Sequence, residues 1–193
     1  MHYHFFAYMA RLKHIRRWNM RRNSFEEDVA QHSLQVSMIA YALAAYRNAR
    51  FGGGANPDRA AALATFHEAP EVITGDIATP IKYFSPEIRA SFGHIEELSA
   101  KKLSALVPED LRPALEPMLV TPEADPEWRR VKAADTIAAY IHCIEEVKAG
   151  NSEFEKVADQ ILQKIHDRYD MPEVRAFLEA CLPSSRRTLE ELD

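Results

Sequence analysis

The chain has 193 residues, of which 47% are hydrophobic and 27% are charged, and its formal net charge is −5 at pH 7. This length and balance are typical of one globular domain with its own core, and they exclude fibrous or largely disordered chains. An acidic chain lacks the broad basic surface that nucleic-acid polymers require, and no apolar run approaches the roughly 20 residues that span a membrane. We therefore expect a single soluble domain over residues 1–193, with no membrane and no nucleic-acid polymer as partner.

The first 25 residues carry six lysine and arginine residues and no aspartate or glutamate. A basic cluster beside an acidic body suits a small anionic ligand, although a solvated helix face is the simpler account of any single arginine. Basic and aromatic residues are interleaved without a separate apolar core, so we expect no secretory signal; a mitochondrial presequence is a weaker alternative. Cys143 and Cys181 form no metal-type pair, so a reduced cytoplasmic setting is the simplest expectation.

Apolar residues at three- and four-residue spacing predict a first helix near residues 3–17. The second helix has two possible starts, since Ser24 with Glu27 forms one capping box and Asp28 with Gln31 forms another. This helix contains the longest apolar run, residues 38–46, which we expect to be buried. It ends at the glycine run 52–54.

Asn56 and Pro57 provide an N-cap and a first-turn proline for a third helix. That helix should end near residues 67–68, because Pro70 disfavours helical geometry at the residue before it. Glycine and proline then predict a loop over residues 74–80. Further helices are expected near residues 85–105 and, more briefly, near 109–118.

The best-marked helix begins at Asp125-Pro126 and ends at Gly150, with a cap, a first-turn proline and a C-terminal glycine. Two more helices are expected at about 152–169 and 172–181. No segment alternates with period two over a useful length, so the fold class is all-α. We expect a single-domain helical bundle with its core at about 4–155, followed by the C-terminal helices.

Polar residues interrupt three of these helices where a plain core would carry apolar ones. His32 lies in the first turn of an apolar helix, and Asp135 lies in mid-helix among alanine and valine. His67 and Glu68 end the third helix. Taken singly, a histidine on an apolar face is usually a hydrogen-bonded core residue, and a mid-helix aspartate is usually exposed or in a salt bridge.

Together the four residues supply two imidazoles and two carboxylates from three helices. This donor set suits one divalent metal ion, with Co²⁺, Mn²⁺ or Zn²⁺ favoured over Mg²⁺, and leaves coordination positions for water and substrate. A metal would also explain buried carboxylates, because it neutralises their charge.

The order of these residues resembles a family signature. His32, then His67-Glu68, then Asp135 is similar to the H…HD…D pattern of the HD-domain phosphohydrolases. Within that superfamily the chain resembles the bacterial HD-domain 5′-deoxynucleotidases over about residues 4–155, and more loosely beyond. The clustered motifs that carry the resemblance lie at 4–7, 11–13, 17–18, 32–36, 67–76, 79–84, 131–135 and 145–146.

The resemblance implies a homodimer of HD-type helical bundles with one divalent metal between the central helices. The implied metal ligands are His32, His67, Glu68 and Asp135. The implied reaction is hydrolysis of deoxynucleoside 5′-monophosphates to deoxynucleoside and phosphate, with little regard for the base. A bound metal lowers the pKa of its water and offsets the negative charge of phosphate.

The resemblance also implies roles for residues around the metal. Glu71 would transfer the proton of the attacking water or the leaving group, and Arg17 would orient the phosphate with its planar donor fork. Trp18 would pack near the sugar and disfavour a 2′-hydroxyl. The remaining implied substrate contacts come from His32, Glu68, Asp135 and a loop that holds the nucleoside, with its aspartate on the sugar hydroxyl: Asp76, Ile77, Ala78 and Thr79.

Glu68 departs from the family, which has aspartate at this position. Glutamate has the same charge, but its carboxylate lies one methylene further from the backbone, and about 1 Å of misplacement can cost about 10²-fold in rate. Three interpretations remain open: an adjusted active site, slow turnover with binding retained, or an engineered variant of an active enzyme. We favour the first, because the other motif residues are all present.

Two alternative functions have distinct signatures. A related HD hydrolase of nucleoside triphosphates or of cyclic or modified nucleotides would release other products from the same metal site. A nucleotide-binding homologue with catalysis impaired by Glu68 would bind deoxynucleotide and metal but release negligible phosphate. A purely structural protein is the bland alternative, and it leaves two histidines and two carboxylates in apolar helices unexplained.

Overall fold

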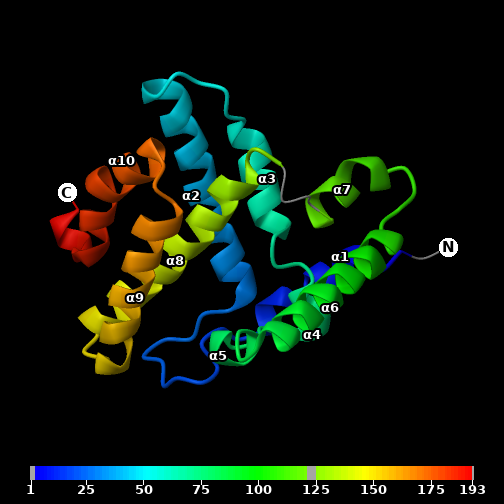
Figure 1. Ribbon diagram of the computed structural model, residues 1–193, viewed down its shortest axis with the longest axis horizontal. Helices are drawn as coiled ribbons and strands as arrows, with labels where there is room; N and C mark the ends of the chain where they lie inside the picture. Colours follow the sequence, from blue (N-terminus) through cyan, green and yellow to red (C-terminus); the bar gives the residue numbers. More distant parts are fainter. Residues whose placement is uncertain (1–2, 121–124, 193) are drawn as a thin grey trace.

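A computed structural model describes residues 3–120 and 125–192, and its regular elements are all helical (Figure 1). Within these residues there is no strand, and only an isolated antiparallel bridge joins Arg16 to Asp28. No helix in the described part combines the length and hydropathy of a membrane span. The all-α prediction is therefore confirmed.

The α-helices have the following bounds: α1 (Phe5–Met9), α2 (Val29–Arg50), α3 (Pro57–Phe66), α4 (Glu71–Thr74), α5 (Thr79–Lys82), α6 (Pro86–Ala105), α7 (Arg112–Leu119), α8 (Trp128–Lys148), α9 (Glu155–Arg168) and α10 (Pro172–Ala180). Short 3-10 helices are η1 (Leu12–His14), η2 (Ser152–Phe154), η3 (Leu182–Arg186) and η4 (Leu189–Glu191).

The main hydrophobic core lies where α2 packs against α3 and α8, with α9 and α10 on its outer side (Figure 1). Its centre includes Leu43, Leu63 and Ile137, whose side chains are fully buried. Each such side chain stabilises the fold by about 1.5–3 kcal/mol relative to an exposed one. The long central helices are therefore rigid supports for any polar group that projects from them.

A second, smaller core lies at the other end of the molecule, where α1, α6 and α7 come together. It contains Phe5, Ala69, Leu103, Val107 and Leu119. Ala69 belongs to the segment between α3 and α4, so this segment links the two cores. Residues next to Ala69 are consequently held from both sides.

The start of α2 settles one of the two alternatives raised by the sequence. Asp28 accepts a hydrogen bond from the backbone N–H of Gln31 at 2.9 Å, and the Gln31 side chain accepts one from the N–H of Asp28 at 3.3 Å. The backbone N–H of Ser24 instead donates to Glu146 on α8. The capping box of Asp28 and Gln31 is therefore the one that forms.

The predicted helix over 3–17 is wrong beyond its first turns. α1 ends at Met9, a short 3-10 turn follows, and Ile15 is already extended, with ψ 113°. The cause is pairing with the segment before α2: the N–H of Arg17 donates to the carbonyl of Glu27, and that of Val29 donates to the carbonyl of Ile15. Backbone pairing outside a helix thus overrides an apolar spacing that favours one.

Three smaller expectations also need correction. The predicted loop over 74–80 contains the end of α4 and the start of α5, whose first turn holds Pro80. α8 starts at Trp128, because Asp125 caps a separate turn by accepting from the N–H of Glu127. Within the apolar run 38–46, Met38 and Tyr41 are 59% and 47% exposed, so this face of α2 is not buried.

Candidate metal centre

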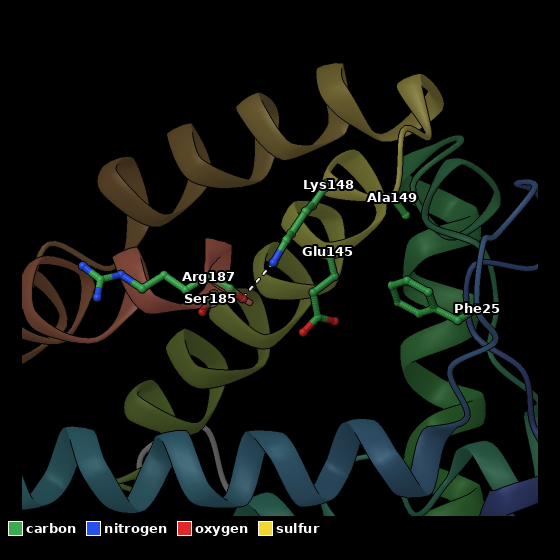
Figure 2. Close-up of a pocket in the computed structure, with 6 residues that line it drawn as sticks. All are labelled: Phe25, Glu145, Lys148, Ala149, Ser185 and Arg187. Atoms are coloured by element: carbon green, nitrogen blue, oxygen red, sulfur yellow. Dashed lines mark hydrogen bonds between the residues drawn. The ribbon is translucent and has the colours of Figure 1, made fainter. Parts of the chain in front are cut away.

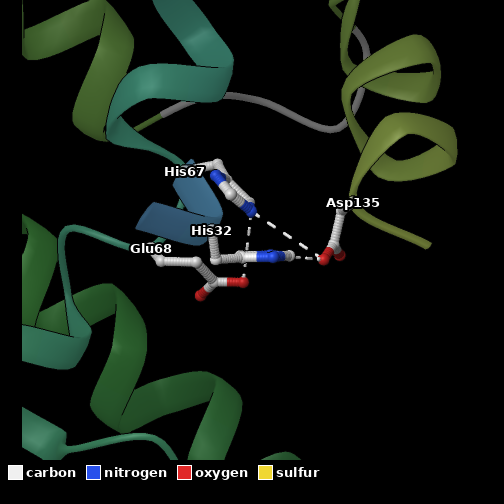
Figure 3. A group of neighbouring side chains, drawn as sticks. All are labelled: His32, His67, Glu68 and Asp135. Atoms are coloured by element: carbon white, nitrogen blue, oxygen red, sulfur yellow. Dashed lines mark hydrogen bonds and ion pairs between the residues drawn. The ribbon is translucent and has the colours of Figure 1, made fainter. Parts of the chain in front are cut away.

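Four side chains predicted as metal ligands come together at the junction of α2, α3 and α8 (Figure 3). His32 comes from the first turn of α2, Asp135 from the middle of α8, and the pair His67-Glu68 from the end of α3. Each can offer one ligand atom such that all lie within 4.8 Å of one another. The structure thus joins residues that are up to 103 positions apart in the sequence.

The segment after α3 is shaped to present the histidine and the glutamate. The N–H of Ala69 donates to the carbonyl of Phe66, and the N–H of Glu71 donates to that of Glu68. These tight turns end α3 before Pro70, which cannot donate a backbone hydrogen bond. The site is therefore built on a short, well-supported corner between the two cores.

His67 is oriented as a metal ligand. Its Nδ1 lies 2.6 Å from the carbonyl oxygen of Ala64, which fits the tautomer that carries its proton on Nδ1. The lone pair of Nε2 then faces Glu68 Oε1 at 3.4 Å and Asp135 Oδ1 at 3.9 Å. This Nε2 is buried and has no hydrogen-bond partner among the described residues, which is costly unless a cation binds there.

His32 and Lys132 both contact Asp135. Nε2 of the fully buried His32 lies 3.1 Å from Oδ1 of Asp135, while Nζ of Lys132 lies 2.9 Å from Oδ2. Burial acts to raise the pKa of Asp135, but Lys132 and the two histidines hold it well below its usual value. Asp135 is therefore ionised, and Lys132 leaves its Oδ1 to face the imidazoles.

The pKa values of two glutamates of the same corner are shifted in opposite directions. Burial opposes ionisation of Glu68, but His67 and Lys132 keep its pKa below the usual value. Burial, together with the charges of Glu68 and Asp76, raises the pKa of Glu71 to about 10. Oε2 of Glu71 is buried, and no residue in the described part of the chain forms a hydrogen bond with it. Glu71 thus lies beside the cluster with a perturbed pKa, and it is not one of the four donor groups.

Arg17 faces the acidic side of this cluster. Burial acts to lower its pKa, but the carboxylates of Glu27, Asp135, Glu68 and Asp76 raise it. Nε of Arg17 donates to Oε2 of Glu27 at 2.9 Å. The planar guanidinium matches the oxygen atoms of a phosphate, which the surrounding carboxylates would repel unless a bound cation offset their charge.

Trp18 is held against α8 beside Arg17. Its ring stacks on that of His142 at 5.2 Å with an interplanar angle of 8°, and it packs edge-on against Phe154. Its Nε1 donates to the same Oε2 of Glu27 at 2.9 Å. Its backbone has φ 57°, in the left-handed region that bulky residues rarely adopt. Such strain persists only where surrounding contacts enforce it.

The predicted nucleoside loop lies between α4 and α5. Asp76 is partly buried. Burial and the charge of Glu68 raise its pKa, and the charge of Arg17 opposes this shift without cancelling it. Its carbonyl oxygen accepts a hydrogen bond from the side chain of Asn19 at 2.9 Å. Ile77 and Ala78 are partly buried, whereas Thr79 is exposed at the start of α5.

Sequence reasoning missed Glu27, Lys132 and His142 as parts of the site. Glu27 is only 9% exposed and bonds both Arg17 and Trp18, yet it lies in an irregular segment where spacing does not indicate a facing side. Lys132 could have been found from its position three residues before Asp135 on a helix, where opposite charges meet.

Two surface hollows lie near α8, and neither is lined by any of the four clustered residues. One, of about 420 Å³, lies between the end of α8 and η3 and contains Lys148, whose Nζ donates to the carbonyl of Arg187 (Figure 2). The other, of about 300 Å³, is bordered by Glu27 and His142. The candidate site is therefore located by the four clustered ligand atoms and not by either surface hollow.

The sequence was compared with protein families and curated proteins. The family model described as "5'-deoxynucleotidase YfbR-like" matches residues 4–185. A 5′-deoxynucleotidase of Vibrio cholerae serotype O1 is 43% identical over 190 residues, covering 98% of this chain and 97% of the relative. The 5′-deoxynucleotidase YfbR of Escherichia coli is also 43% identical, covering 98% of this chain and 95% of the relative.

Solved structures support the same fold. An HD-domain phosphohydrolase from Listeria innocua has a TM-score of 0.81 at 26% identity, covering 94% of this chain and 87% of its own. The cyanophage S-2L HD phosphohydrolase, solved with dA and one catalytic Zn²⁺ ion, has a TM-score of 0.65 at 20% identity and covers 96% of each chain. At that identity the second similarity supports the fold alone.

Proposed function

The chain belongs to the YfbR-like 5′-deoxynucleotidase family, and on that premise we propose how its site hydrolyses deoxynucleoside 5′-monophosphates. The protein is an enzyme: it converts these substrates to deoxynucleoside and phosphate in a reaction that depends on a divalent metal. The observation that carries the proposal is the cluster of His32, His67, Glu68 and Asp135, with the lone pair of His67 Nε2 directed into it.

One divalent metal ion fits this cluster. Two imidazole nitrogens with two carboxylate oxygens favour Co²⁺, Mn²⁺ or Zn²⁺ over Mg²⁺, which prefers oxygen ligands alone. When bound, the metal supplies an activated water and neutralises charge on the phosphate. The cyanophage neighbour, described with one catalytic Zn²⁺ ion, agrees with a site of this kind.

In this proposal Arg17 orients the phosphate, and Trp18 packs near the sugar and disfavours a 2′-hydroxyl. Glu27 engages only Nε of Arg17, so its two terminal nitrogens remain available to oxygen atoms of a phosphate. His142 stacks on one face of the Trp18 ring and fixes it. The rest of the Trp18 ring then limits the space for a 2′-hydroxyl. A ribonucleotide is then disfavoured by contact rather than by charge.

Glu71 holds the proton that the reaction moves. Its raised pKa keeps it protonated at neutral pH, as a group that donates a proton to the leaving 5′-oxygen must be. A side chain in this role contributes about 10²- to 10⁴-fold to the rate. The loop from Asp76 to Thr79 holds the nucleoside, with Asp76 on the sugar hydroxyl, while His32, Glu68 and Asp135 contact both metal and phosphate.

A substrate panel tests this function. Metal-stripped protein is supplied with Co²⁺, Mn²⁺, Zn²⁺ or Mg²⁺ in turn and is given the four dNMPs, AMP, dATP and a cyclic nucleotide. We expect orthophosphate from every dNMP and little from AMP. Pyrophosphate or triphosphate release from dATP, without phosphate from dNMPs, would instead assign the alternative HD activity. Binding of dNMPs with no product would assign the impaired homologue.

Glu68 is compatible with this function. Its carboxylate reaches 3.4 Å from Nε2 of His67, so the longer side chain still places an oxygen among the donor atoms. We propose that the backbone corner around Ala69 accommodates the extra methylene and that activity is kept. The resulting geometry is the feature in which this chain differs from relatives with aspartate.

A homodimer is also proposed. α2 exposes an apolar stripe, defined by Leu34, Met38 and Tyr41, whose side chains are 63%, 59% and 47% exposed. The spacing of four and three residues puts them on one helix face, and such a face is a common partner surface. A second copy of the chain is the partner that the resemblance implies.

The proposed setting is the cytoplasm. Cys143 and Cys181 are both free, and Cys143 is fully buried. Free thiols are the usual state in a reducing compartment. The partner of the site is a small deoxynucleotide rather than a nucleic-acid polymer.

A further inference from the structure

One carboxylate joins the two residues that face the substrate. Oε2 of Glu27 accepts a hydrogen bond from Nε of Arg17 and another from Nε1 of Trp18, both at 2.9 Å. None of the three side chains is fully exposed: Glu27 is 9% exposed, the Arg17 side chain is 12% exposed, and Trp18 is partly buried. A buried, shared, charge-assisted contact fixes geometry more firmly than an exposed salt bridge does.

The backbone brings these adjacent side chains to one oxygen atom. Successive residues of an extended chain point to opposite sides, so Arg17 and Trp18 would ordinarily diverge. The left-handed conformation of Trp18, φ 57°, interrupts that alternation. It costs about 1–2 kcal/mol for a residue with a Cβ, so its contacts must offset the strain.

Glu27 is itself anchored independently of these side chains. Its carbonyl accepts from the N–H of Arg17 at 3.0 Å, and the adjacent residues Arg16 and Asp28 form the antiparallel bridge. The capped start of α2 follows immediately. The carboxylate therefore links the start of α2, the helix that carries His32, to the segment that contains Arg17 and Trp18.

We propose that Glu27 is the positioning residue that sets the phosphate-facing edge of Arg17 and the sugar-facing ring of Trp18, and thereby the preference for a 2′-deoxyribose. This inference rests on the proposed function of Arg17 and Trp18. The other carboxylate oxygen, Oε1, lies 3.9 Å from Nδ1 of His32, which is beyond a hydrogen bond. Glu27 therefore makes its hydrogen bonds to the substrate-facing pair and not to the metal ligand.

Three variants separate its contacts. Glu27→Ala removes both hydrogen bonds, and we expect kcat/KM for dAMP to fall by about 10- to 100-fold, since small misplacements of orienting groups have effects of this size. We expect AMP to lose less, so that the dAMP/AMP ratio narrows by about tenfold. Glu27→Gln keeps an oxygen that accepts from Trp18 but loses the negative charge that pairs with Arg17. This variant should therefore retain most of the dAMP/AMP ratio of kcat/KM. Glu26→Gln is the matched control: within residues 3–120 and 125–192 Glu26 forms an ion pair with Arg16 alone, and both side chains are more than half exposed.

Two further readouts distinguish positioning from general damage. Metal affinity by calorimetry should stay within about threefold of the parent in Glu27→Ala, because no metal ligand is altered. The chain has two tryptophans, so in a Trp128→Phe background Trp18 is the sole tryptophan, and excitation where tyrosine does not absorb reports on it alone. Quenching of Trp18 by acrylamide should rise by about twofold when Glu27 is replaced by alanine, because a restraint on the ring is lost.

Each outcome decides the inference. Equal losses for dAMP and AMP in Glu27→Ala, or behaviour like Glu26→Gln, would overturn it, as would a large loss of metal affinity. If the parent protein releases no phosphate from dAMP, the proposed function fails; unchanged quenching in Glu27→Ala would then overturn the positioning role separately. Increased quenching would support the restraint on Trp18 even in that case.

Discussion

Among single residues, His67 and Glu68 bear most directly on the chemistry. The imidazole is locked by the carbonyl of Ala64, so its second nitrogen is committed to the cluster. Glu68 completes the set with a side chain that is one methylene longer than the family residue, and it still reaches His67 Nε2 to 3.4 Å. The position of one carboxylate oxygen therefore decides how well this corner holds a metal.

Shortening Glu68 tests whether the corner has adapted to glutamate. In this structure Glu68→Asp withdraws the oxygen from the cluster, so we expect metal affinity to fall by about tenfold, and Glu68→Ala to lower it by about 100-fold or more. Metal titration by calorimetry measures both. Tighter metal binding in Glu68→Asp than in the parent would contradict adaptation and would identify Glu68 as a defect.

The four clustered residues could be predicted from the sequence because His32 and Asp135 are polar residues at apolar positions of regular helices, and His67-Glu68 directly follows another such helix. Glu27 could not, because it lies between η1 and α2, where the chain follows tertiary contacts rather than a helical period. The same pairing of 15–17 with 27–29 explains why the N-terminal helix was predicted too long. Long helices with regular apolar spacing were predicted to within a few residues, and segments shaped by distant partners were not.

Among the elements, α8 does more than carry Asp135. Its Glu146 is fully buried and accepts hydrogen bonds from the N–H groups of Ser24 and Phe25 and from the side chain of Asn151. Asn151 also donates to the carbonyl of Arg22 at 2.7 Å. The C-terminal half of α8 thus holds the segment that follows Trp18.

Glu146→Gln should destabilise the fold in a pH-dependent way. Burial opposes ionisation of Glu146, but the hydrogen bonds from Ser24, Asn151 and Phe25 outweigh it and lower its pKa. A lowered folded-state pKa gives stability that is fully present above the unfolded pKa of about 4.5 and lost as the pH falls through the folded value.

Urea unfolding measures this effect. We expect the variant to be less stable than the parent by about 1.5–3 kcal/mol at pH 7, and the difference to shrink below about pH 5. Glu145→Gln is the control, because Glu145 is the exposed neighbour on the same helix. A difference that stays constant from pH 7 to pH 3.5 would contradict an ionised Glu146.

For the whole molecule, the candidate metal site lies between the two hydrophobic cores. Residues 67–71 link the main core around α2, α3 and α8 to the smaller core of α1, α6 and α7 (Figure 1). A cation held by three helices should therefore stabilise the entire fold and not only the local corner. This consequence does not depend on catalysis.

Metal removal should lower thermal stability. At a metal concentration about 100 times the dissociation constant, binding contributes about 2.7 kcal/mol, which corresponds to roughly 5–10 °C in Tm for a chain of this size. Calorimetric scans of the chelated and reloaded protein measure the shift. Asp135→Asn serves as the control and should not respond; an equal shift in that variant would place the metal elsewhere.

The apolar stripe of α2 is the proposed dimer interface, so charged substitutions there should prevent dimerisation. Introducing Leu34→Glu with Met38→Glu puts two charges into the proposed interface, so we expect a dimer to become a monomer with little change in helix content. Sedimentation velocity gives the mass. Thr65→Glu, also at an exposed position, is the matched control. A monomeric parent would contradict the homodimer without affecting the metal site.

Stoichiometric reconstitution tests the central claim most directly. The metal-stripped protein is titrated with Co²⁺ or Mn²⁺ while bound metal and phosphate released from dAMP are followed together. We predict that activity rises in proportion to occupancy, reaches its plateau at one metal per chain and is absent in His67→Asn. Phosphate release that persists in the stripped protein, or that needs no intact cluster, would contradict the assignment of these four residues as the catalytic metal centre.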